Sequence, residues 1–421
     1  MLKVYPVSLG CPKNKVDFEK LLYVLFKKNY KIVFFPEEAD ILWINTCAFI
    51  RPAVEEAIEH ILELGEKKRN GQKLIVSGCL TARYGKETLK KILPEVDEFL
   101  GIEPFKEFVK KEPLERILTE SPFYAYLKIS EGCNYRCSYC TIPKIRGPLR
   151  SRPKEELFKE AETLLKKGIK EIILVAQDIT SYGKDKGEKE GLLKLISKLS
   201  ELPYKFRIRL LYLHPGNIEE KFIKEVLFNP KVVPYFDIPI QHAHPEILKK
   251  MRRPSNSEKI KELIAYIREI NPFSAIRTTV MVGFPGEGER EFLYLYDFIK
   301  EVEFDHLGVF IFYPEEGTYA EKLFPKVSYK ERLKRKREIM KLQREISKKR
   351  LKMRIKSEEE VLILGEDLRG RPFGIAKIQT PEIDGITYLL SNRDKKSLFP
   401  GDLVKVKIKK ASFYDLWGEV I

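Results

Sequence analysis

The chain has 421 residues, of which 43% are hydrophobic and 11% aromatic, a composition that excludes a disordered or low-complexity protein. No stretch approaches about 18 consecutive apolar residues, so we expect no membrane-spanning helix. The apolar run at the N-terminus is short and lacks the cleavage site of a signal peptide, which makes the cytoplasm the expected location. Cysteines are reduced there, so the six cysteines of this chain need not form disulfides.

Positive charge is concentrated in one segment. Lysine and arginine number 78 against 62 acidic residues, which gives a formal net charge of +16. Between Lys330 and Lys356 there are 14 basic residues and three glutamates, a local balance of +11. Such a stripe suggests nucleic acid or a ribonucleoprotein as a partner. A solvated surface helix is the alternative interpretation.

The first hundred residues alternate short strands with helices. The runs Lys3–Leu9, Ile41–Thr46 and Lys73–Ser77 predict buried strands, and Phe18–Lys28 and Ala53–Arg69 predict amphipathic helices between them. Alternation of this kind indicates βαβ units around a parallel sheet. We therefore expect an α/β domain over residues 1–115.

A second α/β block is predicted over residues 122–326. Six β-rich segments recur in it, with helical patterns such as Lys154–Lys167 and Ser257–Ile270 between them. Six repeats fit a partial (β/α)6 barrel, two units short of the eight-fold form, and a doubly wound open sheet is the alternative. The six segments are Tyr124–Ile129, Glu171–Ala176, Phe206–Leu213, Val232–Ile238, Ala275–Val282 and His306–Phe312.

The remaining residues are predicted to form a basic helix and a small barrel. Ile339, Leu342 and Ile346 stand at helical spacing, which predicts a basic connecting helix over residues 327–356. Short β-rich runs separated by turn residues follow over residues 357–421, which indicates a small antiparallel β-barrel or sandwich, a fold that often binds oligonucleotides. The runs are Val361–Leu364, Phe373–Ile378, Ile386–Leu390, Leu403–Ile408 and Tyr414–Val420.

Three cysteines stand close together directly after the predicted strand Tyr124–Ile129. Cys133, Cys137 and Cys140 have the spacing C-x3-C-x2-C, which lets three thiolates converge from one loop on a single inorganic centre. A structural zinc site needs four N or S ligands, and no histidine stands near these cysteines in the sequence. A four-iron cluster tolerates three cysteines and leaves its fourth iron open. Buried free cysteines, or a zinc site completed from a distance, are the alternatives.

The other three cysteines are scattered, but their surroundings match. Cys11, Cys47 and Cys79 each follow a predicted parallel strand by one or two residues. The carboxyl ends of such strands share one edge of the sheet, where open α/β folds bind ligands. Buried core cysteines would be expected inside strands instead. A second three-cysteine cluster site is therefore predicted at this edge.

The cysteine spacing, with the aromatic Tyr139 before the last cysteine, resembles the signature of radical S-adenosylmethionine (SAM) enzymes. An upstream α/β domain with three cysteines and a C-terminal β-barrel resemble, over essentially the whole chain, the methylthiotransferases of that superfamily. The tail from Pro381 to Leu416 resembles their TRAM domain.

Several motifs resemble one branch of the methylthiotransferases, which modifies ribosomal protein S twelve of the small subunit. The motif Gly10-Cys11-Pro12-Lys13-Asn14 resembles that branch, whereas the tRNA-modifying branch usually has Gly-Cys-Gln-Met-Asn. The segments Ile142–Pro148 and Arg209–Pro215 resemble the same branch, and Asp237–Ala243 and Val282–Glu287 suit the whole family. Gly288 departs from the pattern, since threonine is more usual there, but this changes no assigned role.

The resemblance implies a reaction at the β-carbon of an aspartate. It implies that a [4Fe-4S] cluster at Cys133, Cys137 and Cys140 cleaves SAM, and that the 5′-deoxyadenosyl radical removes a hydrogen atom from the substrate. It implies that a second [4Fe-4S] cluster, at the other three cysteines, holds the incoming sulfur, while another SAM supplies the methyl group. The expected partners are ribosomal protein S twelve, free or in the ribosomal subunit, a reductant protein, and RNA contacted by the basic helix and β-barrel.

A few other residues carry weaker expectations. By analogy, Gln177 and Asp178, at the end of the second barrel strand, are predicted to contact SAM together with Tyr139, and ordinary loop polarity is the alternative. His242 and His244 are interpreted as hydrogen-bonded loop residues rather than metal ligands. The glycine-rich segment 282–288 lacks the lysine and spacing of a phosphate loop, so it is predicted to be a tight turn that lines the SAM cleft.

Three functions remain to be compared. The first is a methylthiotransferase acting on the ribosomal protein, and the second is a tRNA methylthiotransferase with the same two-cluster chemistry. The third is a zinc-dependent RNA-binding protein, which would need a fourth ligand that neither cysteine group offers. Because no cysteine lies beyond Cys140, the C-terminal barrel and the basic helix are expected to serve recognition rather than chemistry.

Overall fold

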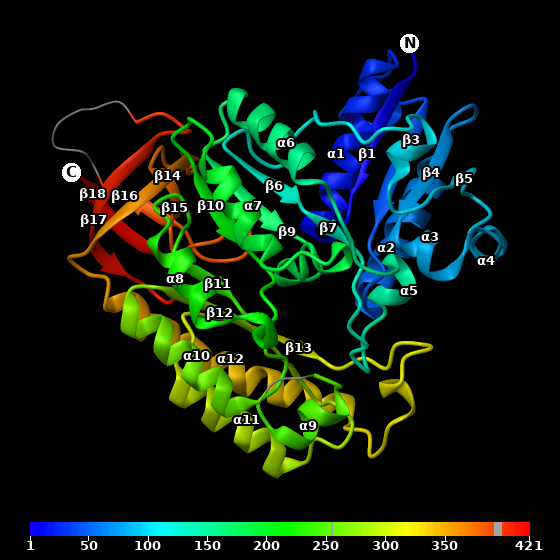
Figure 1. The fold of residues 1–421 in the computed structure, drawn as a ribbon. Coiled ribbons are helices and arrows are strands. Elements are labelled where there is room, and N and C mark those ends of the chain that lie inside the picture. Colours follow the sequence, from blue (N-terminus) through cyan, green and yellow to red (C-terminus); the bar gives the residue numbers. More distant parts are fainter. Residues whose placement is uncertain (254–255, 391–397) are drawn as a thin grey trace.

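The computed structural model describes residues 1–253, 256–390 and 398–421, and Figure 1 shows a parallel sheet, an open barrel and a small closed barrel in chain order. The N-terminal sheet is parallel, with the strand order β2-β1-β3-β4-β5. All six residues of β3 are buried, as expected for a parallel strand that is covered on both faces. The elements are β1 (Lys3–Ser8), α1 (Pro12–Lys27), β2 (Lys31–Ile32), β3 (Ile41–Thr46), α2 (Arg51–Lys67), β4 (Lys73–Gly78), α3 (Cys79–Tyr84), α4 (Lys86–Ile92) and β5 (Glu98–Phe99).

The central block is an open barrel of six parallel strands. Its strands are β6 (Tyr124–Lys128), β9 (Glu171–Val175), β10 (Arg207–Leu210), β11 (Tyr235–Asp237), β12 (Ala275–Val282) and β13 (His306–Ile311). They form two three-stranded groups that a parallel bridge between Ile208 and Val232 connects. The spatial order follows the chain order without reversal, whereas a doubly wound sheet reverses at a switch point. The predicted partial barrel is therefore the one observed.

Helices cover the outer face of this barrel (Figure 1). They are α6 (Lys154–Lys166), α7 (Gly191–Ser200), α8 (Glu220–Phe228), α10 (Ser257–Ile270) and α11 (Glu289–Val302). Of the two shorter helices, α5 (Ile142–Arg146) packs against α3 of the N-terminal domain, and α9 (Pro245–Lys250) packs in a separate apolar cluster with Phe284 and Phe312. A short antiparallel pair, β7 (Ser130–Glu131) and β8 (Arg150–Ser151), frames the loop that carries the second cysteine group. Among the described residues, no helix combines the length and the apolarity needed to cross a bilayer.

The C-terminal residues form a closed five-stranded barrel with the order β14-β15-β16-β18-β17. Four of its pairings are antiparallel, as predicted, and the pairing of β16 with β18 is parallel. A closed ring with an odd number of strands cannot alternate direction throughout, so one parallel pair is unavoidable. The strands are β14 (Glu358–Glu366), β15 (Pro372–Ala376), β16 (Thr387–Leu389), β17 (Leu403–Ala411) and β18 (Leu416–Val420).

The two barrels share a hydrophobic core. The inward-facing residues Tyr126, Ile173 and Tyr235 of the open barrel pack in one cluster with Ile363 and Val406 of the closed barrel. A loop of the closed barrel adds polar ties. Glu382 accepts hydrogen bonds from the hydroxyl groups of Tyr124 (3.0 Å) and Tyr126 (2.8 Å). The closed barrel therefore covers surface that the open barrel leaves apolar, in addition to any role in recognition.

The basic segment forms α12 (Tyr329–Lys352), which lies along β13 and α11. Ser328 caps its N-terminus by accepting a hydrogen bond from the N–H of Glu331. Its apolar residues Ile339 and Ile346 belong to the core of the open barrel. Several of its arginines are buried as well, so part of the positive charge stabilises the fold and is not displayed to a partner.

Candidate functional site

Cys11, Cys47 and Cys79 follow β1, β3 and β4, which are neighbouring strands of the N-terminal sheet. All six cysteines of the chain are free. Burial, and then the nearby charges of Cys11 and Cys79, raises the pKa of Cys47 to about 12. Three cysteines that are distant in sequence therefore meet at the carboxyl edge of the sheet.

Two glycines with left-handed backbone allow the cysteine loops to approach one another. Gly10 has φ +100°, and a Cβ atom there would lie 2.7 Å from Cβ of Cys47. Gly78 also has φ +100°, and its Cβ atom would lie 2.5 Å from the carbonyl oxygen of Thr46. Any side chain at either position would push the loops apart, which explains a glycine before Cys11 and before Cys79.

Buried polar side chains tie the same loops together. Asn14 donates to the carbonyl oxygens of Leu9 (2.8 Å) and Thr46 (3.1 Å). Asn45 donates to the carbonyl oxygen of Asn14 (3.1 Å) and accepts from the hydroxyl of Ser77 (3.0 Å). Because satisfied buried networks are rigid, the positions of the three thiols are set by hydrogen bonds between neighbouring strands.

Cys133, Cys137 and Cys140 lie in one loop after β6 and β7. The N–H of Cys133 donates to the carbonyl oxygen of Gly147 (3.1 Å), and the N–H of Cys140 donates to that of Cys137 (3.1 Å). Burial, opposed by the N–H of Ile142 and reinforced by the charges of Cys137 and Cys133, raises the pKa of Cys140 to about 12. These thiols lie beyond the carboxyl ends of the barrel strands, where such barrels place their active sites.

The spread of the sulfur atoms favours a cluster over a single ion. Tetrahedral zinc, with Zn–S bonds of about 2.3 Å, requires sulfur atoms about 3.8 Å apart. Within residues 1–253, 256–390 and 398–421, Asp17, Glu103 and Glu131 are the one trio whose candidate ligand atoms all lie within 4.8 Å of one another. Neither cysteine group meets that limit. Repulsion between neighbouring thiolates keeps the thiols protonated, but a bound cation such as iron stabilises the thiolate forms. Both donor sets therefore fit an iron–sulfur cluster.

The carboxylate trio is not a metal site, because a lysine fills it. The ammonium of Lys128 contacts Asp17 and lies 2.9 Å from Glu131 and 3.8 Å from Glu103. A buried ammonium between three carboxylates already provides the cation that such a trio needs.

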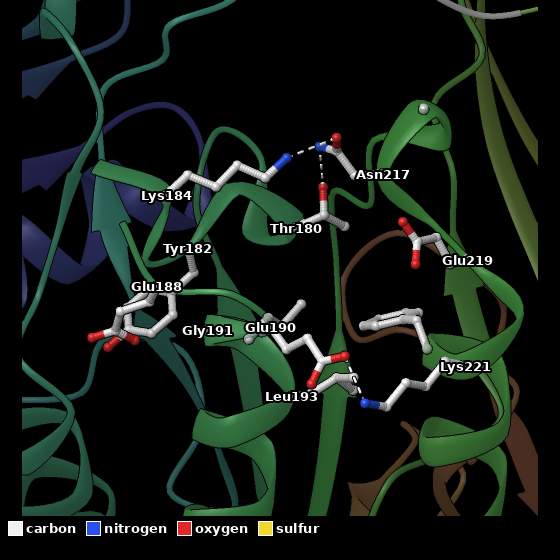
Figure 2. Close-up of a pocket in the computed structure, with 13 residues that line it drawn as sticks. Thr180, Tyr182, Lys184, Glu188, Glu190, Gly191, Leu193, Asn217, Glu219 and Lys221 are labelled. Carbon is white, nitrogen blue, oxygen red and sulfur yellow. Dashed lines mark hydrogen bonds and ion pairs between the residues drawn. The ribbon is translucent and has the colours of Figure 1, made fainter. Parts of the chain in front are cut away.

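A hollow of about 230 Å³ opens beside Cys133 and is lined by Tyr135, Asp178 and Lys184, among others. Lys184 also borders a neighbouring hollow of about 200 Å³, drawn in Figure 2, where it donates to Asn217 (2.8 Å). The amide of Asn217 donates to the hydroxyl groups of Tyr135 (2.7 Å) and Thr180 (2.9 Å). Asp178 accepts from Thr180 and Ser181, so local hydrogen bonds hold its carboxylate beside the hollow.

The other predicted SAM contacts lie elsewhere. Gln177 donates to Glu131 (3.0 Å), away from the hollow of Asp178, and its Oε1 atom is buried without a partner among the described residues. Tyr139 packs on the apolar cluster that contains Phe284 and Phe312, so the glycine-rich turn 282–288 lies beneath the cysteine loop. The structure does not gather these three residues in one pocket, and their contacts with SAM remain a prediction.

His242 and His244 are linked by a hydrogen bond within their loop, in line with the interpretation from the sequence. Nδ1 of His242 accepts from the N–H of His244 (3.0 Å), and its Nε2 atom lies 3.3 Å from Glu287. Glu287 in turn accepts from Arg335 of α12 (2.8 Å). His242 therefore helps to anchor α12 on the open barrel.

Two charged residues between the cysteine groups escaped the sequence analysis as site residues. Arg146 donates through Nη1 to both carboxylate oxygens of Glu131 (2.9 Å each) and through Nη2 to Sγ of Cys79 (3.3 Å). Arg146 ends α5 just after the second cysteine group, and Glu131 precedes Cys133 by two residues. The basic motif 142–148 was the available signal, but its partner in the N-terminal sheet could not be identified from sequence.

Comparison with known proteins follows this division into three parts. A model of the radical SAM superfamily matches residues 127–299, one of the uncharacterized protein family UPF0004 matches residues 3–101, and one of the TRAM domain matches residues 357–421. A protein of Thermoanaerobacter sp. (strain X514) is 44% identical over 442 residues, with 100% of both chains covered. Those of Aquifex aeolicus (strain VF5) and Thermotoga maritima are 44% and 42% identical, and cover 99% and 98% of this chain and 97% and 98% of their own. All three are named ribosomal protein uS12 methylthiotransferase RimO.

The chain belongs to the ribosomal protein uS12 methylthiotransferase family. The predictions of a radical SAM methylthiotransferase and of a C-terminal TRAM barrel are confirmed. Membership in the radical SAM superfamily implies SAM and a [4Fe-4S] cluster as cofactors, so the zinc-dependent RNA-binding protein is excluded. Nothing supports the tRNA alternative better than the protein-modifying one.

A solved structure agrees on the fold. The radical SAM methyltransferase TsrM from Kitasatospora setae was solved with cobalamin and a [4Fe-4S] cluster bound. It superposes on the present uS12 methylthiotransferase family member with a TM-score of 0.52, over 73% of this chain and 74% of its own. The two sequences are 14% identical, so the likeness extends to the fold alone.

Proposed function

We propose that this methylthiotransferase adds a methylthio group to the β-carbon of an aspartate in small-subunit ribosomal protein uS12, and that it does so with two [4Fe-4S] clusters. The observation that carries the proposal is the pair of three-cysteine groups joined by Arg146 and Glu131. Full-length similarity to proteins named for uS12 supports the choice of substrate. We place the domain boundaries where the sequence analysis expected them, at residues 1–115, 122–326, 327–356 and 357–421.

The two cysteine groups would have separate roles. Cys133, Cys137 and Cys140 would hold the cluster next to SAM, with Asp178 as a SAM contact beside the hollow at Cys133. The N-terminal group would hold the second cluster. When bound, the two clusters supply the electron for SAM cleavage and an iron that accepts the sulfur donor. Asn14 and Arg146 would orient the N-terminal group through the hydrogen bonds described above.

A reductant protein would deliver the electron, and the exposed basic residues of α12 would contact RNA near the substrate. Long-range attraction between such a face and ribosomal RNA would speed encounter with uS12 in the assembling subunit. Both partners follow from the proposed reaction, which needs an electron and takes place on a ribosomal protein.

The proposal is tested by mass spectrometry of small-subunit proteins and of bulk tRNA from cells that lack the gene. We expect uS12 to lose one methylthio group while tRNA is unchanged. Loss of a methylthio group from tRNA alone would assign the chain to the other substrate. Purified, anaerobically reconstituted protein should contain about eight irons per chain, four for each cluster.

A further inference from the structure

Lys13 is a cation on a buried residue and has no anionic partner within ion-pair distance in the part of the chain that the structure describes. Lys13 is 8% exposed, and its ammonium lies over the ring of Tyr212, 3.8 Å from the ring centroid. No hydrogen bond or ion pair joins it to another of the described residues. The other buried lysines and arginines among the described residues all donate to a carboxylate or a carbonyl oxygen; they are Lys20, Arg83, Arg116, Lys128, Arg146, Arg152, Arg207, Arg209, Arg332, Arg335, Arg350 and Arg354.

The aromatic ring attracts the ammonium, but a ring does not replace an oxygen acceptor, so the N–H donors of Lys13 make no hydrogen bond to the described residues. Lys13 therefore lacks the partner that its twelve counterparts have. An anion that arrives with a ligand would supply it.

The position of Lys13 indicates which ligand that is. It follows Cys11 by two residues, and the charged groups around it are those of Cys11, Glu131, Arg146 and Asp237, none of which forms an ion pair with it. Tyr212 stands just beyond the carboxyl end of β10, so the pair lies between the N-terminal cysteine group and the mouth of the open barrel.

The backbone beneath Lys13 is strained. Tyr212 has φ +65°, a left-handed conformation that is rare for a bulky residue and that clusters at functional sites. Its N–H donates to the carboxylate of Asp237 (2.9 Å), and its carbonyl oxygen accepts from the N–H of Ile179 (3.2 Å). Two neighbouring strand ends thus hold the tyrosine ring in place below the ammonium.

We propose that Lys13 binds the side-chain carboxylate of the substrate aspartate and that Tyr212 positions the ammonium for it. This inference rests on the proposed function. The carbon that receives sulfur is bonded directly to the carboxyl carbon, so the carboxylate must lie beside the cysteine group from which sulfur arrives. Among the described residues, Lys13 is the buried cation beside the N-terminal cysteine group that donates no hydrogen bond.

The test compares reconstituted wild-type protein with Lys13→Met, which keeps the length of the side chain and removes its charge. The probes are two peptides with the uS12 target sequence, one with the target aspartate and one with asparagine in its place. A charged hydrogen bond of about 1.5–3 kcal/mol corresponds to roughly 10- to 100-fold in affinity, so the wild type should prefer the aspartate peptide by that factor. Lys13→Met should bind both peptides equally, and Lys13→Arg should recover part of the preference.

Three controls separate the explanations. Lys15→Met, which removes a lysine paired with Glu120 and Glu382, should keep the preference. Iron content of Lys13→Met should match the wild type, which shows that the cysteine groups are filled. Its affinity for SAM should also match, since SAM carries a carboxylate of its own; a parallel loss of SAM affinity would overturn the inference in favour of that carboxylate.

The inference also fails if Lys13→Met still prefers the aspartate peptide, or if an active wild type shows no preference. Failure of the proposed function looks different, because wild-type enzyme would then modify neither the aspartate peptide nor intact uS12. The two failures are therefore distinguishable in the same set of samples.

Discussion

Nη2 of Arg146 lies 3.3 Å from Sγ of Cys79, and the same guanidinium holds both carboxylate oxygens of Glu131 at 2.9 Å. Arg146 and Glu131 flank the second cysteine group in sequence, whereas Cys79 belongs to the first group. One side chain therefore connects the two parts of the site. The nearby charges of Glu131, Cys79 and Cys11 raise the pKa of Arg146, against the effect of burial, so it is a permanent cation.

In the proposed two-cluster enzyme, Arg146→Met should make the N-terminal cluster harder to reduce, because a positive hydrogen-bond donor to one of its sulfur ligands is lost. A difference of about 1.4 kcal/mol between redox states corresponds to about 60 mV for one electron. The potential is best measured in the Cys137→Ala background, in which only the N-terminal cluster is expected to remain. Arg150→Met is the control, since that side chain is exposed and lies 3.7 Å from Glu103. Equal potentials at equal iron content would refute the role of Arg146.

The two cysteine groups should be separable by mutation. Cys137→Ala should abolish formation of 5′-deoxyadenosine from SAM in the presence of dithionite, whereas Cys47→Ala should retain it. Each variant should lose about four of the eight irons, because removal of one thiolate empties its own cluster. If Cys47→Ala also fails to cleave SAM while it keeps four irons, the division of roles proposed here is wrong.

Stability at low pH should depend on Glu160, which ties α6 to the N-terminal domain. Its carboxylate lies 2.7 Å from Arg152 and 3.1 Å from Lys20. Burial alone would raise the pKa of Glu160, but Arg152, Lys20 and Arg116 hold it at about 2 instead of 4.5. A lowered pKa in the folded state adds stability above pH 4.5 that is lost as pH falls from 4.5 towards 2.

Glu160→Gln should therefore lower the free energy of unfolding at pH 7 by about 3 kcal/mol and flatten its pH dependence in that acid range. Glu162→Gln on the same helix removes a more exposed pair with Lys166 and should cost much less. Urea unfolding at several pH values measures both effects. Parallel curves for the wild type and Glu160→Gln between pH 5 and about 3 would show that Glu160 does not titrate with folding.

The architecture can be predicted from the sequence because local patterns of residues determine its helices and strands. The helix Ser257–Ile270 and the strand Ala275–Val282 were predicted to the residue, and the cysteines were placed at strand ends. The contact of Arg146 with Cys79 spans 67 residues, and no local periodicity reports such a pairing. The same holds for the burial of Arg335 against Glu287, which requires knowing that α12 lies on the open barrel. Contacts between domains are the part that periodicity cannot supply.

The shared core changes the expectation for the C-terminal barrel. A chain ending near Ser357 would expose Tyr126, Ile173 and Tyr235 to water, so we expect it to aggregate rather than to bind both clusters. The milder variant Asp384→Asn deprives the half-buried Arg277 of its closest carboxylate (2.6 Å) and should destabilise the chain by about 3 kcal/mol. Asp367→Asn, on an exposed turn of the same barrel, should have little effect on the melting temperature. A soluble truncated chain with full iron content would contradict this account.

The exposed face of α12 should contribute to substrate encounter and its buried face to folding. Arg335 and Arg350 are buried against Glu287 and Asp305, so reversing them would disturb the fold. Lys336, Arg337 and Lys341 are exposed and free of ion pairs among the described residues, which makes them the appropriate positions for charge reversal.

Reversal of these three residues to glutamate should slow modification of uS12 within ribosomal particles about tenfold at low salt and much less at high salt, because exposed charges are screened within about 10 Å at 0.1 M. Reversal of Lys28, Lys86 and Lys91 in the N-terminal domain changes the net charge equally at exposed positions that are also free of ion pairs among the described residues, and it serves as the matched control. Iron content and melting temperature should be the same in both triple variants. The measurement is the initial rate of methylthio incorporation at several salt concentrations. Equal rates in the two variants at low salt would mean that net charge alone matters and that α12 is a solvated face without a partner.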